Sequence, residues 1–144
     1  MTKVIFGAYD FQFTQTQGLK QIKDPVRKKY VALTPEEWVR QHVLHYLIGL
    51  GYSSALIAVE RGIIVNDRSK RFDVVVYGQD SKPVILVECK AEGEPMNQAV
   101  MMQVMSYNLQ LQAQYFWLTN GVENYFVRLH DGKVLDTVPT YKSL

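Results

Sequence analysis

Three β-rich runs follow one another between residues 55 and 90, and they constrain the fold more than any other feature of the chain. The runs are "ALIAVERGIIVN", "RFDVVVYG" and "PVILVECK", and the short polar segments "DRSK" and "QDSK" separate them. Both segments have the composition of tight turns, so the pattern predicts a meander of three neighbouring strands. A β-sheet is therefore expected at the centre of the fold.

Helical patterns precede and follow this meander. The segment "LTPEEWVRQHVLHYLIGLGY" offers Thr34 as an N-cap, Pro35 at the first helical position and Glu37 to complete a capping box. Gly49, or the next glycine two residues later, is expected to end this helix. A second helix is predicted at residues 97–112, "NQAVMMQVMSYNLQLQ".

Two further runs, "YFWLTNG" and "NYFVRLHDGKV", predict strands after the second helix. A helix between two strands acts as a crossover, which brings a parallel pair into the sheet. The order of elements thus predicts an α/β (α+β) fold, with a mixed central sheet of about five strands flanked by two main helices.

The composition is that of one globular domain, because 47% of the 144 residues are hydrophobic and 21% are charged. We expect a single domain over residues 1–144, with a core at 34–130 and a strand or polar connector at 1–33. Within the latter, "KVIFGAYDF" is a candidate edge strand. Neither a membrane span nor a signal peptide is evident, and the lone cysteine excludes an internal disulfide. These features predict a cytoplasmic protein without a membrane partner.

A basic cluster precedes the first predicted helix. Its members are Lys20, Lys23, Arg27, Lys28 and Lys29. Such a cluster suits contact with phosphate, but a solvated face explains it equally well, and the sequence leaves both possibilities open.

Acidic residues interrupt the apolar pattern of two predicted strands. Alternation places Asp73 on a face with Val75, and it places Glu88 on a face with Leu86 and Lys90. If the two strands are neighbours, Asp73 lies near Glu88 and Lys90. Two carboxylates held close together repel each other unless a cation lies between them. Their oxygen atoms suit Mg²⁺ or Mn²⁺, and an adjacent ammonium group can orient water or stabilise charge on a phosphate.

A structural ion network among Asp73, Glu88 and Lys90 is the alternative interpretation of the same pattern. Ordinary salt bridges produce many such arrangements, so these three residues alone do not decide between the two. Cys89, which has no metal-ligand spacing to another cysteine, is interpreted as a small packed residue.

The first predicted helix carries another acid on the side that faces the sheet. A rotation of about 100° per residue places Val43 and Leu47 in one apolar sector, and Glu36 falls inside it. Glu37 lies far outside this sector, where capping is a sufficient role. Arg40 borders the sector, and we expect it to pair with Glu36 or to reach a phosphate.

The order of an aspartate and a later Glu-x-Lys on adjacent strands resembles the active-site motif of the PD-(D/E)xK nuclease superfamily. Asp73, Glu88 and Lys90 match this motif, whereas Phe72 stands where proline is usual. The segment "QVMSY" resembles the Gln-x-x-x-Tyr element of RecB-like nucleases.

The resemblance extends to the N-terminal nuclease domain of type I restriction enzyme R proteins. The segments "LTPEEWVRQHVLHYLI", "RFDVVVYG", "VILVECKAEG", "QVMSYN" and "WLTNG" occur in the order found there, over roughly residues 30–130. Those R proteins continue into a helicase motor, and this chain ends at Leu144. We therefore expect a stand-alone relative, or one that works with other subunits.

The resemblance implies a metal-dependent endonuclease domain that hydrolyses DNA phosphodiester bonds and leaves a 5′-phosphate. It implies that Asp73 and Glu88 hold Mg²⁺ or Mn²⁺, with the Cys89 carbonyl as a further ligand. Lys90 would position or deprotonate the attacking water, and Glu36 would add a carboxylate directly or through water. The residues expected to orient the DNA backbone are Gln103, Tyr107 and Arg40.

Two alternatives to this function stay open. A chain of the same fold could serve as a catalytically silent module for nucleic-acid binding or complex assembly. RNA could also replace DNA as the substrate, because no base-reading pattern is present and DNA is implied only by the resemblance. Other restriction-system subunits are the expected partners, and cutting of both strands would favour a homodimer.

Overall fold

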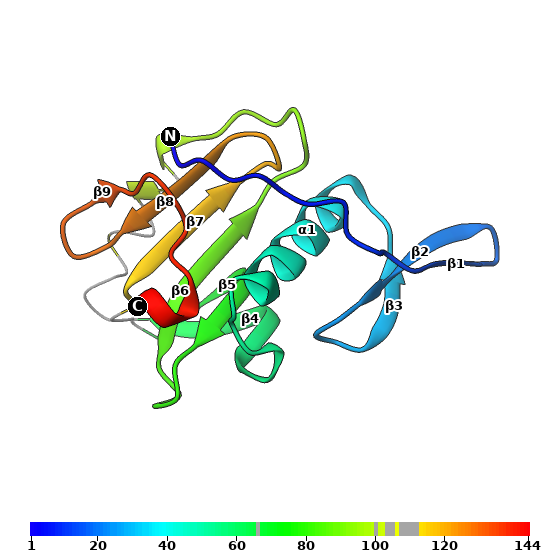
Figure 1. Ribbon diagram of the computed structural model, residues 1–144, viewed down its shortest axis with the longest axis horizontal. Coiled ribbons are helices and arrows are strands. Elements are labelled where there is room, and N and C mark those ends of the chain that lie inside the picture. Colours follow the sequence, from blue (N-terminus) through cyan, green and yellow to red (C-terminus); the bar gives the residue numbers. More distant parts are fainter. Residues whose placement is uncertain (66, 100, 103–105, 107–112) are drawn as a thin grey trace.

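The computed structural model describes residues 1–65, 67–99, 101–102, 106 and 113–144. Its largest element is a six-stranded sheet in the order β4-β5-β6-β7-β8-β9 (Figure 1). The strands are Ile57–Val65 (β4), Arg68–Tyr77 (β5), Pro83–Cys89 (β6), Tyr115–Thr119 (β7), Asn124–Arg128 (β8) and Lys133–Val134 (β9). β6 and β7 run parallel, and the other neighbouring pairs are antiparallel. The predicted mixed sheet is confirmed.

The predicted meander corresponds to β4, β5 and β6, which pair in sequence order. The "QDSK" turn is present, because the Gly78 N–H donates to the Lys82 carbonyl at 2.9 Å. The "DRSK" segment belongs mostly to β5, which begins at Arg68. The predicted last strand divides into β8 and β9, since the Gly132 N–H donates to the Arg128 carbonyl and closes a turn there. The sheet therefore has six strands instead of about five.

The helix α1, Pro35–Gly49, has the predicted ends, and Thr34 Oγ1 accepts the N–H of Glu37 at 3.0 Å. It packs across one face of the six-stranded sheet (Figure 1). Its buried residues Val39, Val43 and Leu47 contact the sheet in a cluster that also contains the following side chains: Val74, Val76, Ile85, Val87, Cys89, Trp117 and Phe126. A second cluster contains Phe72, Val75, Leu86, Phe116 and Leu118.

The prediction of two flanking helices requires correction, because the described residues contain one main helix, α1. The parallel pairing of β6 with β7 still requires a crossover between residues 90 and 114. Residues 98–99, 101–102 and 106 are helical, and the rest of the predicted helix lies outside the described residues. No helix in the described part of the chain is long and apolar enough to cross a membrane.

Residues 13–32 form a separate three-stranded antiparallel sheet, where we expected a polar connector. Its strands are Phe13–Thr16 (β1), Leu19–Asp24 (β2) and Lys29–Ala32 (β3). Gln17 and Gly18, which both have positive φ angles, form the two-residue turn between β1 and β2. The Asp24 carboxylate closes the β2–β3 turn by accepting the N–H groups of Val26 and Arg27 at 2.8 and 2.7 Å. The small sheet lies beyond one side of α1 (Figure 1).

The candidate edge strand "KVIFGAYDF" is not a strand. Its sheet contact is an isolated bridge between Lys3 and Thr137. The aromatic side chains of this segment pack instead on α1, where Phe6 contacts Tyr46 and Tyr9 stacks on His45.

Candidate active site

Two neighbouring strands bring the candidate acids to one end of their pairing. Asp73 lies in β5, Glu88 lies near the end of β6, and Lys90 directly follows β6. The antiparallel register pairs Val74 with Val87, one residue inside the two acids. Asp73 Oδ2 accepts the backbone N–H of Cys89 at 2.7 Å. Strand N–H groups point toward the neighbouring strand, so this bond places the Asp73 carboxylate between the ends of β5 and β6.

The regular alternation of side chains breaks at Asp73. The β4–β5 pairing skips Glu60 and Asp73, and Glu60 has a φ of 53°, a conformation that residues other than glycine rarely adopt. Phe72, not Asp73, packs with Val75 in the second core cluster. The expectation that Asp73 and Val75 share a face is therefore wrong, because the Cys89 N–H and Arg40 of α1 draw the Asp73 carboxylate away from that cluster.

Glu88 is nearly buried and has a lysine partner that the sequence analysis missed. Its side chain is 11% exposed, and Lys70 Nζ lies 3.6 Å from its Oε1. Burial and the negative charge of Asp73 raise the pKa of Glu88 to about 6, although Lys70 and Lys90 act in the opposite direction. Lys70 also lies over the Phe72 ring. Only the strand register, which decides which β5 residues face Glu88, could have identified Lys70 as its partner.

The raised pKa of Glu88 predicts a specific pH dependence of folding in the metal-free protein. Below the unfolded-state pKa near 4.5, the Glu88 carboxyl group is neutral in both the folded and the unfolded protein, and it does not affect stability. Above about 6 it is ionised in both, and because the ionised form is less favourable in the folded protein, it lowers the free energy of unfolding. Glu88→Gln should therefore gain about 2 kcal/mol of stability relative to wild type between pH 4.5 and 7. Urea unfolding across this range with a chelator present measures the difference. The exposed Glu123→Gln should show no such gain, and an equal gain in both variants would contradict the assignment to Glu88.

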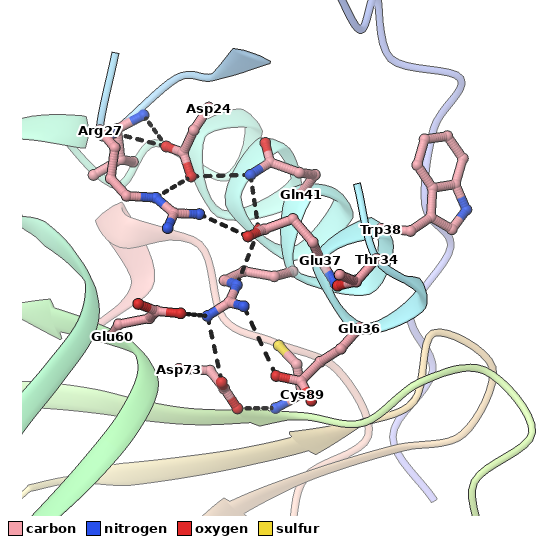
Figure 2. Close-up of polar contacts among 12 residues, drawn as sticks. Asp24, Arg27, Thr34, Glu36, Glu37, Trp38, Gln41, Glu60, Asp73 and Cys89 are labelled. Carbon is pink, nitrogen blue, oxygen red and sulfur yellow. Dashed lines mark hydrogen bonds and ion pairs between the residues drawn. The ribbon is translucent and has the colours of Figure 1, made fainter. Parts of the chain in front are cut away.

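Arg40 of α1 lies at the centre of a group of carboxylates. Its Nε donates to Glu37 Oε2 at 3.0 Å, and its Nη1 lies 3.4 Å from both Glu60 Oε1 and Asp73 Oδ1 (Figure 2). Its Nη2 lies 3.8 Å from Glu36 Oε1, so the expected pairing with Glu36 is present. The Arg40 side chain is only 6% exposed. Contact between Arg40 and a substrate phosphate stays a prediction.

Glu37 joins the small sheet to this group. It was expected to be an outward-facing cap, but its side chain is buried, and Oε1 pairs with Arg27 Nη2 at 2.9 Å. Gln41 Nε2 donates to both Glu37 and Asp24, at 3.2 and 2.9 Å (Figure 2). The expectation failed because the three-stranded sheet covers this side of α1 and supplies Arg27. A helical projection against one sheet cannot detect a second one.

Glu36 and Lys90 lie in the same neighbourhood as the two strand acids. Burial and the charge of Asp73 raise the pKa of Glu36, whereas Arg40 and Lys90 lower it. Lys90 also lowers the pKa of Glu88, so its ammonium group acts on both glutamates. Electrostatic interactions thus link Glu36, Asp73, Glu88 and Lys90. Gln103 and Tyr107 lie outside the described residues.

The donor atoms near Asp73 suit a hard cation held by few protein ligands. In the residues that the structure describes, no group of three or more His, Cys, Asp or Glu side chains is placed to hold a metal ion. Mg²⁺ is often bound through one or two carboxylates, with water and substrate phosphate completing its coordination, so the pair of Asp73 and Glu88 fits this need. The Cys89 thiol is buried, which raises its pKa and makes it unsuitable as a ligand. Its carbonyl stays a predicted ligand.

Comparisons with known proteins concern the family and the fold of the chain. A family model described as "Type I restriction enzyme R protein N terminus" matches residues 35–139. A solved fragment of a chain assigned as an HsdR subunit of a type I restriction enzyme, from Vibrio vulnificus, is similar with a TM-score of 0.57 and 24% identity. The match covers 78% of this chain and 24% of that chain, so this chain spans about a quarter of its length. No curated protein matches.

Proposed function

The chain belongs to the family of the type I restriction enzyme R protein N terminus, and on this premise we propose that it is a metal-dependent nuclease domain that hydrolyses phosphodiester bonds of DNA. The observation that carries the proposal is the strand register, which places Asp73 of β5 and Glu88 of β6 next to each other on adjacent strands, with Lys90 directly after β6. Two carboxylates from adjacent strands can hold a divalent cation together with water and phosphate, and the amine supplies a group that can act on water.

Each residue has a role that its surroundings support. Asp73 and Glu88 would hold Mg²⁺ or Mn²⁺, which when bound polarises a phosphate oxygen and lowers the pKa of a bound water. Lys90 donates a hydrogen bond to the attacking water and stabilises negative charge on the phosphate. Glu36 accepts a hydrogen bond from a water at the site. Arg40 keeps the Asp73 carboxylate in position through the 3.4 Å contact.

A silent module of the same fold is the second candidate, and one observation favours it. Both acids already have cationic partners within the chain, since Arg40 lies beside Asp73 and Lys70 lies beside Glu88. If these internal cations fully satisfy the acids, no divalent ion is needed. Under the first candidate, in contrast, the domain would be the nuclease of a restriction system and would act on DNA together with other subunits of that system.

Calorimetric titration with Mn²⁺ separates the two candidates. The wild type should show a binding site, and Asp73→Asn should weaken it by at least about tenfold, because a ligand should matter no less than the outer-shell partners that tune metal affinity. Asparagine keeps an oxygen for the Cys89 N–H, so the fold should persist. Asp131→Asn, which removes an exposed partner of Arg128, is the matched control and should leave binding unchanged. A wild type without a site, or with one that Asp73→Asn does not alter, would favour the silent module.

A further inference from the structure

The three-stranded sheet of residues 13–32 lies outside the part of the chain that the family model matches, residues 35–139. It also carries a cluster of exposed positive charges. Residues 11–33 contain five basic residues and one acidic residue, and four of these are exposed lysines. The lysines are Lys20, Lys23, Lys28 and Lys29. The sheet is therefore a basic element outside the matched part of the chain.

The end of the hairpin formed by β2 and β3 concentrates these charges. The register pairs Lys23 with Tyr30 and Asp24 with Lys29, and Lys28 lies in the turn. Lys23 Nζ lies over the Tyr30 ring, 5.8 Å from its centroid, and Tyr30 is 38% exposed. We refer to Lys23, Lys28, Lys29 and Tyr30 as the basic hairpin.

The one acid in this segment does not neutralise the lysines. Asp24 is fully buried, and its carboxylate accepts hydrogen bonds from Arg27 and Gln41 at 2.9 Å each. Although burial acts to raise it, these hydrogen bonds keep the pKa of Asp24 below its usual value. The Asp24 charge is thus directed inward, and the exposed surface of the hairpin end keeps a net positive charge.

A continuous series of ion pairs fixes the basic hairpin relative to the candidate active site. Arg27 Nε lies 2.9 Å from Asp24 in the turn, and Arg27 Nη2 lies 2.9 Å from Glu37 on α1. Glu37 lies 3.0 Å from Arg40, which lies 3.4 Å from Asp73 (Figure 2). Each link is short and mostly buried, so the hairpin and Asp73 are held in one arrangement.

We propose that the basic hairpin binds the phosphate backbone of the DNA on which the candidate active site acts. Exposed lysines attract phosphates and release the counterions bound to those phosphates, which favours binding. Half-exposed Tyr30 adds a planar ring of the kind that contacts sugars and bases. The proposal rests on the proposed function in taking DNA, and not another polyanion, as the occupant.

Fluorescence anisotropy with a labelled DNA duplex tests the proposal, using the full chain and EDTA so that no cleavage occurs. The triple variant Lys23→Gln, Lys28→Gln and Lys29→Gln should bind about tenfold more weakly at low salt. The magnitude of the slope of log K against log salt should fall by about 3, because three phosphate contacts are lost and each contributes roughly one unit. All three side chains are exposed, so an unchanged unfolding temperature is expected.

The matched control removes the same charge elsewhere, through Lys82→Gln, Lys133→Gln and Lys142→Gln, which are exposed lysines of other elements. It should bind DNA almost as well as the wild type. Equal losses in both triples would overturn the proposal, because net charge alone would then explain binding. If the wild type bound labelled poly-glutamate as tightly as it binds DNA, and the hairpin triple variant lost this binding, DNA would be overturned as the occupant. Absence of cleavage in Mg²⁺ would instead contradict only the proposed function, because the binding assay requires no catalysis.

Discussion

Lys90→Ala should lower the rate of Mg²⁺-dependent plasmid cleavage by about 10²–10³-fold, the range expected when one hydrogen-bond donor to developing negative charge is lost. The reason is the location of the ammonium group, which lowers the pKa of both Glu36 and Glu88 and therefore lies beside the acids of the site. Binding of Mn²⁺ should persist, because Asp73 and Glu88 remain. The initial rate of conversion of supercoiled plasmid to nicked and linear forms, with an EDTA blank, measures the effect.

Lys70→Ala is the sharpest comparison for this prediction. Lys70 Nζ lies 3.6 Å from Glu88 Oε1, so two lysines compete for the role that the sequence motif assigns to Lys90. We expect Lys70→Ala to lose much less activity, and the exposed Lys82→Ala to lose none. Full activity in Lys90→Ala would remove Lys90 from the mechanism. A larger loss of activity in Lys70→Ala than in Lys90→Ala would show that Lys70 of β5, and not Lys90, has this role.

Local signals were sufficient to predict the elements that position the site. The helix ends follow from Thr34 and Gly49, and the β5 and β6 strands follow from apolar runs on either side of a turn sequence. Adjacency of the strands carrying Asp73 and Glu88 follows from that short turn. The three-stranded sheet escaped prediction because its strands are largely exposed. Ile22 is the only apolar residue of that sheet in the buried core, so no apolar alternation marks it.

The orientation of side chains within the site could not be predicted, because it depends on contacts between distant segments. Asp73 departs from the alternation of β5 because a backbone N–H of β6 and a guanidinium of α1 bind its carboxylate. Glu37 is buried because a turn ten residues earlier provides Arg27. In both cases the partner lies on an element whose place in the fold is not encoded by the local pattern.

Arg40→Met should destabilise the metal-free protein by about 3–5 kcal/mol, the cost of leaving buried charges without their partner. Methionine keeps much of the apolar volume, so the loss reports on the charge more than on packing. Glu37 and Asp73, whose side chains are 7% and 17% exposed, would lose the cation between them. Urea unfolding at pH 7 with a chelator measures the change, and the unfolding temperature should fall by roughly 10 °C.

A double-mutant cycle with Glu37→Gln decides whether the two residues act as one unit. If Arg40 and Glu37 stabilise each other, the double variant should be less destabilised than the sum of the single variants, by about 1–3 kcal/mol. Arg128→Met, which breaks the exposed pair with Asp131, should change stability little and serves as the control. Strict additivity would mean that Arg27 alone satisfies Glu37. The basic hairpin and Asp73 would then be held by independent contacts, and the continuous series of ion pairs between them would carry no coupling.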